Sequence, residues 1–397
     1  MGAIKLTGRG RRWILGGHPW VYADDVAGGE GEPGELVPVH DPHGSVLGWG
    51  LFSSASKICI RFVTREAAPP DRAFWLGRVR RAIEARERLG LLVPGGACRL
   101  IAGDAEGLPG FVVDRYADVL VLSSGCQGSD RLRDLFLELL EESLPFAPRA
   151  VLDRSDTAVR RLEALAPRVE WLRGAPVETV EVVEEERDGD PCLVYEVAPA
   201  AGHKTGHYLD QVLNRRRAAR HARGTEVLDA FSYDGLFGVR AALAGARAVL
   251  CLDQSAAAGE RLARNAERNG VADRVVFARA DAMRDLRRRG EAGERYGLVI
   301  VDPPAFARNR REAAGAARGY RELNRRAMGL VAEGGVLVSA SCSYNVRREE
   351  FLEHLTAAAL AAGREARLLE LTAAGPDHPV LLGLPESGYL KCAFLRM

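Results

Sequence analysis

Residues 226–238 read EVLDAFSYDGLFG, which joins a short apolar strand to a glycine-containing loop and the start of a helix. The same alternation recurs downstream, with strands expected at 248–253, 275–277, 298–302, 336–340 and 389–395 and helices expected at 235–244, 255–269, 281–289, 318–332 and 346–362. Alternating strands and helices favour right-handed crossovers and a doubly wound parallel sheet. We therefore expect an α/β domain with a Rossmann-like sheet over residues 191–397.

Two smaller modules precede this domain. Residues 1–70 contain short apolar runs broken by glycine and proline, with strands expected at 34–39, 46–52 and 57–63, and predict a small β module. Residues 71–190 predict a small α+β module, with helices at 74–89 and 130–142, strands at 98–101, 110–114 and 119–123, and a closing hairpin of 177–186 and 192–197 around a turn at 188–190.

Composition narrows the class of protein. The 397 residues include no apolar stretch of the roughly 18 residues that a membrane span needs, and no apolar segment follows the basic N-terminus as in a secretory signal. The seven cysteines form no Cys-x-x-Cys pair, which is typical of a reducing compartment and argues against structural zinc. We expect a cytoplasmic protein without a membrane segment or a metal.

The basic residues are strongly skewed toward arginine. The net charge is +1, and only four of the 55 lysine and arginine residues are lysines: Lys5, Lys57, Lys204 and Lys391. A lysine in such a composition marks a position that needs a compact ammonium rather than a guanidinium. Lys204 stands in a distinctive stretch of sequence, whereas the other three stand in less informative surroundings.

The loop at 229–238 indicates what the sheet binds. Ligands of open parallel sheets bind beyond the carboxyl ends of the strands, and a dinucleotide site would place Gly-x-Gly-x-x-Gly there. That triplet is missing, which disfavours a nicotinamide-dependent dehydrogenase. The loop instead offers Asp229, aromatic side chains and Gly235, which suit a cationic amino acid better than a pyrophosphate.

Two further strand ends carry acidic residues. Asp253, followed by Gln254, can accept the hydroxyls of a ribose, and Asp281 with Ala282 can read an adenine edge. Each aspartate taken alone could equally be a helix N-cap. An amino acid, a ribose and an adenine without a phosphate together describe S-adenosylmethionine. The predicted cofactor residues are Lys204, Tyr208, Asp210, Asp229, Phe231, Ser232, Tyr233, Gly235, Asp253, Gln254, Asp281, Ala282 and Asp302.

The first of these residues lie in a loop at 202–211, which reads GHKTGHYLDQ. Two glycines with polar and aromatic residues between them predict a loop that covers a ligand and enters a helix, although an ordinary turn with an N-cap would look similar. His203 and His207 are four residues apart, but no third ligand has a suitable spacing, so we predict no metal site.

The stretches 300–306 (IVDPPAF) and 339–343 (SASCS) indicate the reaction. Cytosine carbon 5 becomes nucleophilic only after a thiolate adds to carbon 6, and an acidic group at ring nitrogen 3 stabilises the charge that develops. Asp302 and Cys342 supply these two groups on successive strand ends, and we predict both as catalytic. Pro303 and Pro304 would form a stiff wall for the base, with Phe306 beside it. The alternative for Cys342 is a small buried hydrophobe, the more common fate of cysteine and the one expected for Cys59, Cys251 and Cys392.

Together these residues resemble the bacterial 23S ribosomal RNA cytosine carbon-5 methyltransferases that carry an N-terminal PUA domain. The resemblance rests on the motifs at 17–22, 56–61, 104–110, 203–211, 229–238, 302–306 and 341–343. It implies an RNA-binding PUA module with His18, Trp20 and Lys57 as contacts, a middle module that forms part of the RNA cleft, an S-adenosylmethionine-binding sheet, attack of Cys342 on cytosine, and 23S ribosomal RNA as partner.

The sequence differs from some cytosine methyltransferases at one position, and it leaves two alternative functions open. Some cytosine methyltransferases carry a second cysteine after the motif proline, whereas this chain has Pro304-Ala305, so product release must proceed otherwise. Guanine methyltransferases of ribosomal RNA share a similar Asp-Pro-Pro-x-Phe, which leaves guanine-nitrogen methylation with a structural Cys342 as the alternative enzyme. A non-catalytic RNA-binding assembly factor is the alternative from another class. The oligomeric state is open, with a homodimer as one option.

Overall fold

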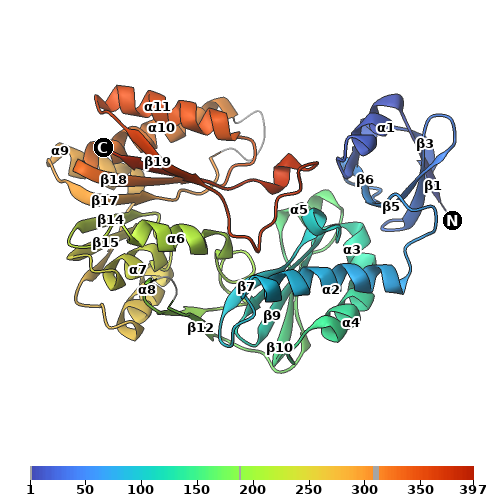
Figure 1. The fold of residues 1–397 in the computed structure, drawn as a ribbon, viewed down its shortest axis with the longest axis horizontal. Helices are drawn as coiled ribbons and strands as arrows, with labels where there is room; N and C mark the ends of the chain where they lie inside the picture. Colours follow the sequence, from blue (N-terminus) through green and yellow to red (C-terminus); the bar gives the residue numbers. More distant parts are fainter. Residues whose placement is uncertain (1, 187–188, 307–312) are drawn as a thin grey trace. The chain divides into compact units, whose positions relative to one another are not determined.

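The computed structural model describes residues 2–186, 189–306 and 313–397 of the chain. It divides into two compact units. The first unit comprises Met1–Val182, Val197–Leu209 and Pro376–Ser387, and the second comprises Val183–Glu196, Asp210–Gly375 and Gly388–Met397. Figure 1 follows the chain through both units in sequence colours.

The first unit begins with a six-stranded sheet around its own apolar core. Its strands are β1 (Ala3–Leu6), β2 (Trp20–Tyr22), β3 (Val26–Glu30), β4 (Leu36–His40), β5 (Val46–Phe52) and β6 (Ile58–Thr64), in the order β2-β6-β5-β4-β1-β3. The expectation of strands alone is wrong at one place, because Gly8–Leu15 form the helix α1. The Thr7 hydroxyl starts this helix by accepting a hydrogen bond from the Gly10 N–H at 3.1 Å.

A five-stranded sheet follows in the same unit. It consists of β7 (Ala97–Ala102), β8 (Phe111–Tyr116), β9 (Val119–Ser124), β10 (Ala150–Ser155) and β11 (Arg168–Arg173), in the order β11-β10-β9-β8-β7. Helix α2 (Arg72–Arg88) lies where it was predicted and packs against α4 (Arg133–Ser143). The predicted helix at 130–142 is divided between α3 (Gln127–Arg131) and α4. Strands β10 and β11 and the short helix α5 (Ala158–Leu162) between them were not predicted.

The predicted hairpin is present as a separate two-stranded sheet. It pairs β12 (Val180–Glu184) with β13 (Leu193–Val197). Of the turn expected at 188–190, Asp188 lies outside the described residues.

A seven-stranded sheet forms the centre of the second unit. Its strands are β14 (Glu226–Ala230), β15 (Ala248–Asp253), β16 (Val275–Arg279), β17 (Tyr296–Val301), β18 (Val331–Ser341), β19 (Arg367–Thr372) and β20 (Lys391–Arg396), in the order β16-β15-β14-β17-β18-β20-β19. The first five strands in this order are parallel, as predicted. The fully parallel expectation fails at one edge, because β20 runs antiparallel to both β18 and β19.

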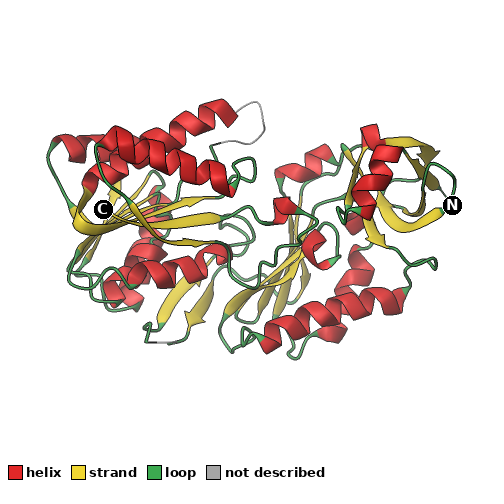
Figure 2. Cartoon of the chain, turned by 45° about the horizontal axis from the view of Figure 1, so that its top comes forward, coloured by secondary structure: helices red, strands yellow, loops and turns green. Residues whose placement is uncertain are grey.

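Helices cover both faces of this sheet (Figures 1 and 2). One layer contains α6 (Val212–Ala219), α7 (Leu236–Leu243) and α8 (Ala256–Arg268), and the other contains α9 (Ala282–Glu291), α10 (Ala313–Leu330) and α11 (Arg348–Ala362). Because both faces are covered, β14, β17 and β18 are buried and read as nearly continuous apolar runs. The Rossmann-like fold class is therefore confirmed. Within the part of the chain that the structure describes, no helix is long and apolar enough to cross a membrane.

A buried carboxylate ties β12 to the helices of the second unit. Glu184 accepts from Arg215 Nη2 at 2.7 Å and from Arg240 Nη2 at 2.5 Å, and all three side chains are buried. Burial by itself would raise the pKa of Glu184, but the two guanidinium charges outweigh that effect and lower it. The carboxylate is thus needed to balance two buried cations.

We expect Glu184→Ala to destabilise the protein by about 3–5 kcal/mol, because it removes the carboxylate that two buried guanidinium groups share. Urea unfolding at pH 7 measures the loss. Glu226→Ala is the matched control, since its pair with Arg247 is exposed and its removal should shift the midpoint far less. The Glu184 contribution is present above the ordinary pKa of 4.5 and should disappear as the pH falls below it, so wild type and variant should converge in acid. Equal losses in the two variants at pH 7 would contradict this role.

Candidate active site

Asp302 and Cys342 follow neighbouring parallel strands. Strand β17 ends at Val301 and β18 at Ser341, and the register pairs Val301 with Ser339. On the other side of β17, Val301 pairs with Ala230, the last residue of β14. The carboxyl ends of three parallel strands therefore lie side by side, and the strands that precede Asp302 and Cys342 are neighbours, as predicted.

A chain of amide and hydroxyl groups orients the Asp302 carboxylate. Gln211 Nε2 donates to Asp302 Oδ2 at 3.0 Å, and Asn214 Nδ2 donates to Gln211 Oε1 at 2.7 Å. Thr372 Oγ1 in turn donates to Asn214 Oδ1 at 2.7 Å. Sequence reasoning quoted Gln211 within a motif but gave it no role, and it missed Asn214 and Thr372. No local pattern could have joined the 211–214 segment to Asp302 and to Thr372, because these are three separate segments of the chain.

The serines beside Cys342 hold the backbone rather than the substrate. The Ser341 hydroxyl donates to the Tyr320 hydroxyl at 2.9 Å, and the Tyr320 hydroxyl lies 3.0 Å from Ser343 Oγ. Both serines and Tyr320 are buried, whereas Cys342 is half-buried. Cys59, Cys251 and Cys392 are buried as expected. Cys342 therefore differs from them in being accessible at the strand end.

An aromatic pair supports the same strand ends. The Phe306 ring lies edge-on to Tyr320, with 4.8 Å between centroids and an interplanar angle of 90°. Pro303 is buried and Pro304 is exposed. Phe306 is half-buried, so part of its ring is accessible beside the thiol-bearing strand.

Asp229 is the most perturbed acid of this edge. It is buried, and its Oδ2 accepts the Gly238 N–H at 3.0 Å. A side chain at Gly238 could not fit, since its Cβ would lie 2.5 Å from Cys251 Sγ. Burial, with a further contribution from the charges of Asp302, Asp253 and Asp234, raises the pKa of Asp229 to about 7. A cationic ligand group would relieve this crowding of negative charge.

The loop after β14 has an unusual backbone. Phe231 and Tyr233 have φ angles of 64° and 52°, in the left-handed region that few side chains adopt, and Gly235 has a φ of 76°. The Tyr233 N–H donates to Asp253 Oδ2 at 2.9 Å. The buried Ser232 hydroxyl has no hydrogen-bond partner among the described residues. Strain and an unused polar group at a strand end are both typical of a ligand site.

Among the remaining predicted cofactor residues of the second unit, Asp253 keeps acceptor positions for a ligand, whereas Asp281 serves as a helix N-cap. Asp253 also accepts the Ser255 N–H at 2.9 Å, but each of its oxygens keeps a second acceptor position for a hydroxyl. Asp281 caps α9 through the Arg284 N–H and accepts from Gln254 Nε2 at 3.0 Å. The N-cap alternative therefore describes Asp281, whose role toward a ligand stays a prediction. Ala282 is buried directly after it.

The loop at 202–211 is divided between the two units. Lys204 and Tyr208 belong to the first unit, where the Lys204 ammonium lies 4.5 Å from the centroid of the Tyr208 ring. His203 Nδ1 lies 3.0 Å from the Tyr208 hydroxyl. Asp210 belongs to the second unit, is buried and accepts from the Tyr389 hydroxyl at 2.7 Å. No group of three or more metal-ligating side chains occurs in residues 2–186, 189–306 and 313–397.

The three residues predicted to contact RNA differ in exposure. His18 is 7% exposed and its Nδ1 accepts the Trp20 N–H at 3.1 Å. Trp20 is half-buried and donates from Nε1 to Asp104 at 2.7 Å, whereas Lys57 is exposed. Trp13, which sequence reasoning passed over, is 41% exposed and lies 5.0 Å from His18. It belongs to helix α1, which was not expected.

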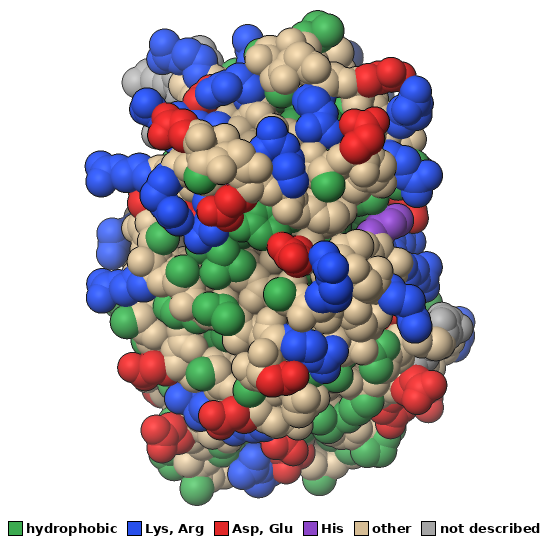
Figure 3. Space-filling model, turned by 90° about the vertical axis from the view of Figure 1, so that its left-hand side faces the viewer, with side chains coloured by type: hydrophobic (Ala, Val, Ile, Leu, Met, Phe, Trp, Pro, Cys, Tyr) green, Lys and Arg blue, Asp and Glu red, His purple; other side chains and the backbone are tan. Residues whose placement is uncertain are grey.

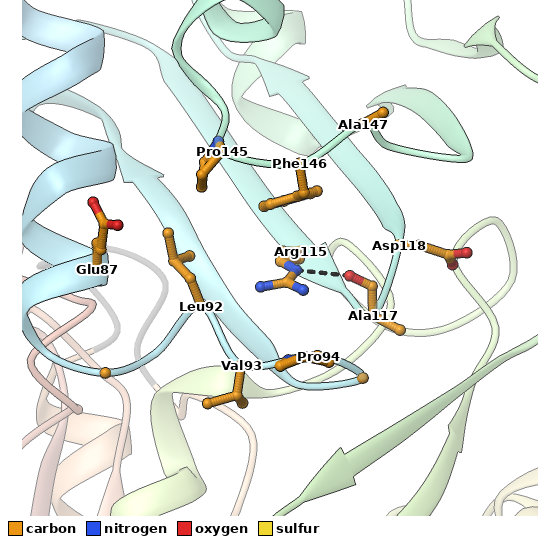
Figure 4. A pocket seen from close by; sticks show the side chains of 12 residues that line it. Glu87, Leu92, Val93, Pro94, Arg115, Ala117, Asp118, Pro145, Phe146 and Ala147 are labelled. Carbon is orange, nitrogen blue, oxygen red and sulfur yellow. Dashed lines mark hydrogen bonds between the residues drawn. The ribbon is translucent and has the colours of Figure 1, made fainter.

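Two further surface features bear on ligand binding. A cavity of ≈ 830 Å³ in the first unit is lined mainly by apolar residues around Arg115, which stacks over Phe146 at 4.3 Å (Figure 4). None of the predicted site residues lines it. Figure 3 shows a face on which basic and acidic side chains are interspersed, in keeping with a net charge of +1.

Comparisons with known proteins agree with this geometry. A family model for PUA-like domains matches residues 4–65, and one for S-adenosylmethionine-dependent methyltransferases matches residues 151–381. Two curated relatives, from Aeromonas hydrophila and Shewanella denitrificans, are both called ribosomal RNA large subunit methyltransferase I. Each is 37% identical, with 99% of this chain and 99% of the relative covered.

Solved structures share the fold over the whole chain. A protein described as a methyltransferase complexed with SAH superposes with a TM-score of 0.86 at 19% identity, and the match covers 100% of both chains. A protein from Streptococcus mutans, described as an S-adenosylmethionine-dependent methyltransferase, gives a TM-score of 0.84 at 19% identity, covering 99% of this chain and 100% of the other.

We expect the affinity for S-adenosylhomocysteine to rise between pH 5.5 and 7.5, because its ammonium group pairs with Asp229 only when that carboxyl, with its raised pKa of about 7, is ionised. Below that pKa the affinity should change by up to about tenfold per pH unit. Calorimetric titration across this range measures it. Asp229→Asn should flatten the profile, and Asp273→Asn, which removes an exposed acid, should reproduce the wild-type profile. An unchanged slope in Asp229→Asn would exclude this pairing.

Proposed function

Because the chain belongs to the ribosomal RNA large subunit methyltransferase I family of S-adenosylmethionine-dependent methyltransferases, we propose that it methylates carbon 5 of a cytosine in 23S ribosomal RNA through a bond to Cys342. The observation that carries the proposal is the half-buried Cys342 thiol directly after β18, next to the strand that ends before Asp302. A structural cysteine would be expected to be buried, as Cys251 and Cys392 are.

The cofactor of this family fits the residues at the strand ends. Asp229, crowded by other acids, suits the ammonium of the amino-acid portion, and the unused Ser232 hydroxyl lies in the same loop. Asp253 retains acceptor positions for ribose hydroxyls. When bound, S-adenosylmethionine supplies an electrophilic methyl group on a sulfonium. The lack of a glycine-rich phosphate loop agrees with a cofactor that has no phosphate.

Cys342 and Asp302 would activate the base together. The Cys342 thiolate forms a bond to carbon 6, and its electron pair displaces the ring π electrons onto carbon 5 and toward nitrogen 3. Asp302 in its protonated form donates its proton to nitrogen 3, which neutralises the negative charge that develops there, and takes the proton back when the ring is restored. After carbon 5 has been methylated, loss of its proton to a base and breakage of the carbon 6–sulfur bond restore the ring and release the thiolate. Gln211, which donates to Asp302 Oδ2, keeps this carboxyl in place.

The target cytosine must be reached outside a stacked helix. Enzymes that act on base atoms generally bind unpaired or flipped-out nucleotides. The accessible part of Phe306 offers a surface for stacking, and Pro303-Pro304 stiffens the backbone before it. We therefore assign Pro303, Pro304 and Phe306 to the base-binding side of the site.

The first two modules are proposed to bind the RNA. Residues 1–70 contain the PUA-like match, and within them Lys57 is an exposed cation and Trp20 a half-buried aromatic. Residues 71–190 are proposed to form part of the RNA cleft, and residues 191–397 to carry the methyl transfer. With ribosomal RNA as its substrate, the protein is proposed to act in the cytoplasm. A homodimer stays a prediction that sedimentation velocity would test.

Methylation of a guanine nitrogen is the second candidate function, because the Asp302-Pro303-Pro304-x-Phe306 stretch suits that reaction as well. In that case Cys342 would not touch the base. Nucleoside analysis of methylated RNA separates the two products. A non-catalytic assembly factor is disfavoured by the acidic residues at four successive strand ends, and failure to bind S-adenosylhomocysteine would favour it.

We expect Cys342→Ala to abolish methylation, because no thiolate remains to add to carbon 6. RNA that contains 5-fluorocytosine should form a covalent adduct with the wild-type protein. Breakage of the carbon 6–sulfur bond requires loss of a proton from carbon 5, and fluorine at that position cannot leave as a cation, so the bond remains. The adduct should be absent in Cys342→Ala and present in Cys192→Ala, which removes the exposed cysteine. Wild-type methylation by Cys342→Ala would refute the thiol mechanism.

Bisulfite sequencing of 23S ribosomal RNA should locate the product. We expect one cytosine to be protected in cells that contain the gene and to be converted in cells that lack it. Restoring the wild-type gene should restore protection, whereas the Cys342→Ala gene should not. If every cytosine converts equally in both strains, carbon-5 methylation of this RNA is wrong.

A further inference from the structure

Lys391 is a buried lysine at the thiol-bearing strand end. It is 5% exposed and is the first residue of β20, where the antiparallel register pairs it with Ser341. Its Nζ donates to the Ser343 carbonyl at 2.6 Å and to the Tyr389 carbonyl at 2.8 Å. One of the four lysines in an arginine-rich chain thus occupies a place where a guanidinium, with its planar fork, would not make the same two bonds.

The charge of Lys391 is not neutralised by a nearby carboxylate. Within the described residues no acid lies within ion-pair distance of its Nζ. The carboxylate that raises the pKa of Lys391 is that of Glu350. Glu350 already accepts hydrogen bonds from the Arg347 N–H at 2.8 Å and from Arg347 Nη2 at 3.0 Å. Burial lowers the pKa of Lys391 to about 8, while the negative charges of Cys342 and Glu350 act in the opposite direction. A buried, unpaired ammonium destabilises a protein unless another group uses its charge.

We propose that Lys391 is a positioning residue for the nucleophile: it fixes the peptide after Cys342 and places an ammonium at the strand end that carries the thiol, where its charge stabilises the thiolate. The inference rests on the proposed function, in which Cys342 is the attacking group. Two of the three ammonium protons are donated to carbonyls, so one proton remains for a further acceptor. A positive charge near a cysteine lowers the pKa of its thiol and makes it more reactive at neutral pH.

Hydrogen bonds on both sides of Cys342 fix the backbone on which the Lys391 charge acts. Tyr320 holds Ser341 and Ser343 through their hydroxyls, and Lys391 holds the Ser343 carbonyl, so the backbone on both sides of Cys342 is fixed. The other titratable groups at this network are Tyr320 from α10, and Glu350 and His354 from α11. Burial raises the pKa of Tyr320 and lowers that of His354, which favours the neutral form of both groups at pH 7.

The pH dependence of Cys342 alkylation tests the proposal directly. In a Cys192→Ser background, which removes the exposed thiol, the rate of reaction with iodoacetamide would be followed from pH 6 to 9.5 by mass spectrometry of the Cys342 peptide. Lys391→Met should raise the midpoint by about one pH unit and slow the reaction at pH 7 about tenfold. Lys5→Met removes an exposed lysine of the first unit and should leave the profile unchanged. An unchanged midpoint in a folded Lys391→Met protein overturns the proposal.

A second measurement leaves Lys391 in place, in case Lys391→Met does not fold. Protein labelled with ¹³C at the lysine ε-carbons gives four side-chain signals, one for each lysine. Because the coupling between two titrating groups is reciprocal, Cys342→Ala should lower the titration midpoint of the Lys391 signal. An identical midpoint in both proteins overturns the pairing. Neither measurement uses RNA or a methyl donor, so both are independent of the test of methylation. The effect of Lys391 on the thiol can be absent even if Cys342 is the nucleophile. It can also be present even if Cys342→Ala still methylates RNA and the proposed function is wrong.

Discussion

The site depends on the in-register parallel pairing of β14, β17 and β18. Because Ala230, Val301 and Ser339 lie side by side, the residues that follow these strands emerge at one edge of the sheet. A slip of one residue in any pair would turn every side chain of that strand to the opposite face. The same pairing buries the apolar runs that fix the register, so the core and the site are specified together.

Bringing acids to one edge has an electrostatic cost that a cation can offset. Asp229, Asp253 and Asp302 follow or end three neighbouring strands, and their mutual repulsion adds to the burial that raises the pKa of Asp229. At the strand end that carries Cys342 the charge is of the opposite sign, because the buried Lys391 ammonium donates to the carbonyl of the next residue, Ser343. Acids therefore gather at the ends of β14, β15 and β17, and a buried cation lies at the end of β18.

The sequence predicted most of the strands that are apolar runs, although it missed the buried strand β10. Strands β14 to β18 were found because they are continuous apolar runs, whereas β11 and β19 were missed because most of their side chains are exposed and show no period. Helix α1 was missed because it contains two glycines and three arginines, although Thr7 caps it and Ile14 packs into the core. At the site, the strand-end acids and Cys342 were found from their local positions. Gln211, Asn214 and Thr372 were not, since only folding brings Asp302, the 211–214 segment and Thr372 together. Lys391 was also missed, because its surroundings in the sequence are uninformative.

The loop after β14 also restricts how this chain can vary over evolutionary time. Phe231 and Tyr233 have left-handed backbone conformations, which β-branched residues adopt only with strain, and Gly238 has no room for a side chain. Positions 231 and 233 therefore disfavour β-branched residues, and position 238 accepts only glycine. The exposed edge strand β19 has no such restriction. Related sequences should therefore diverge quickly along β19 and slowly in this loop, even where the loop makes no contact with a ligand.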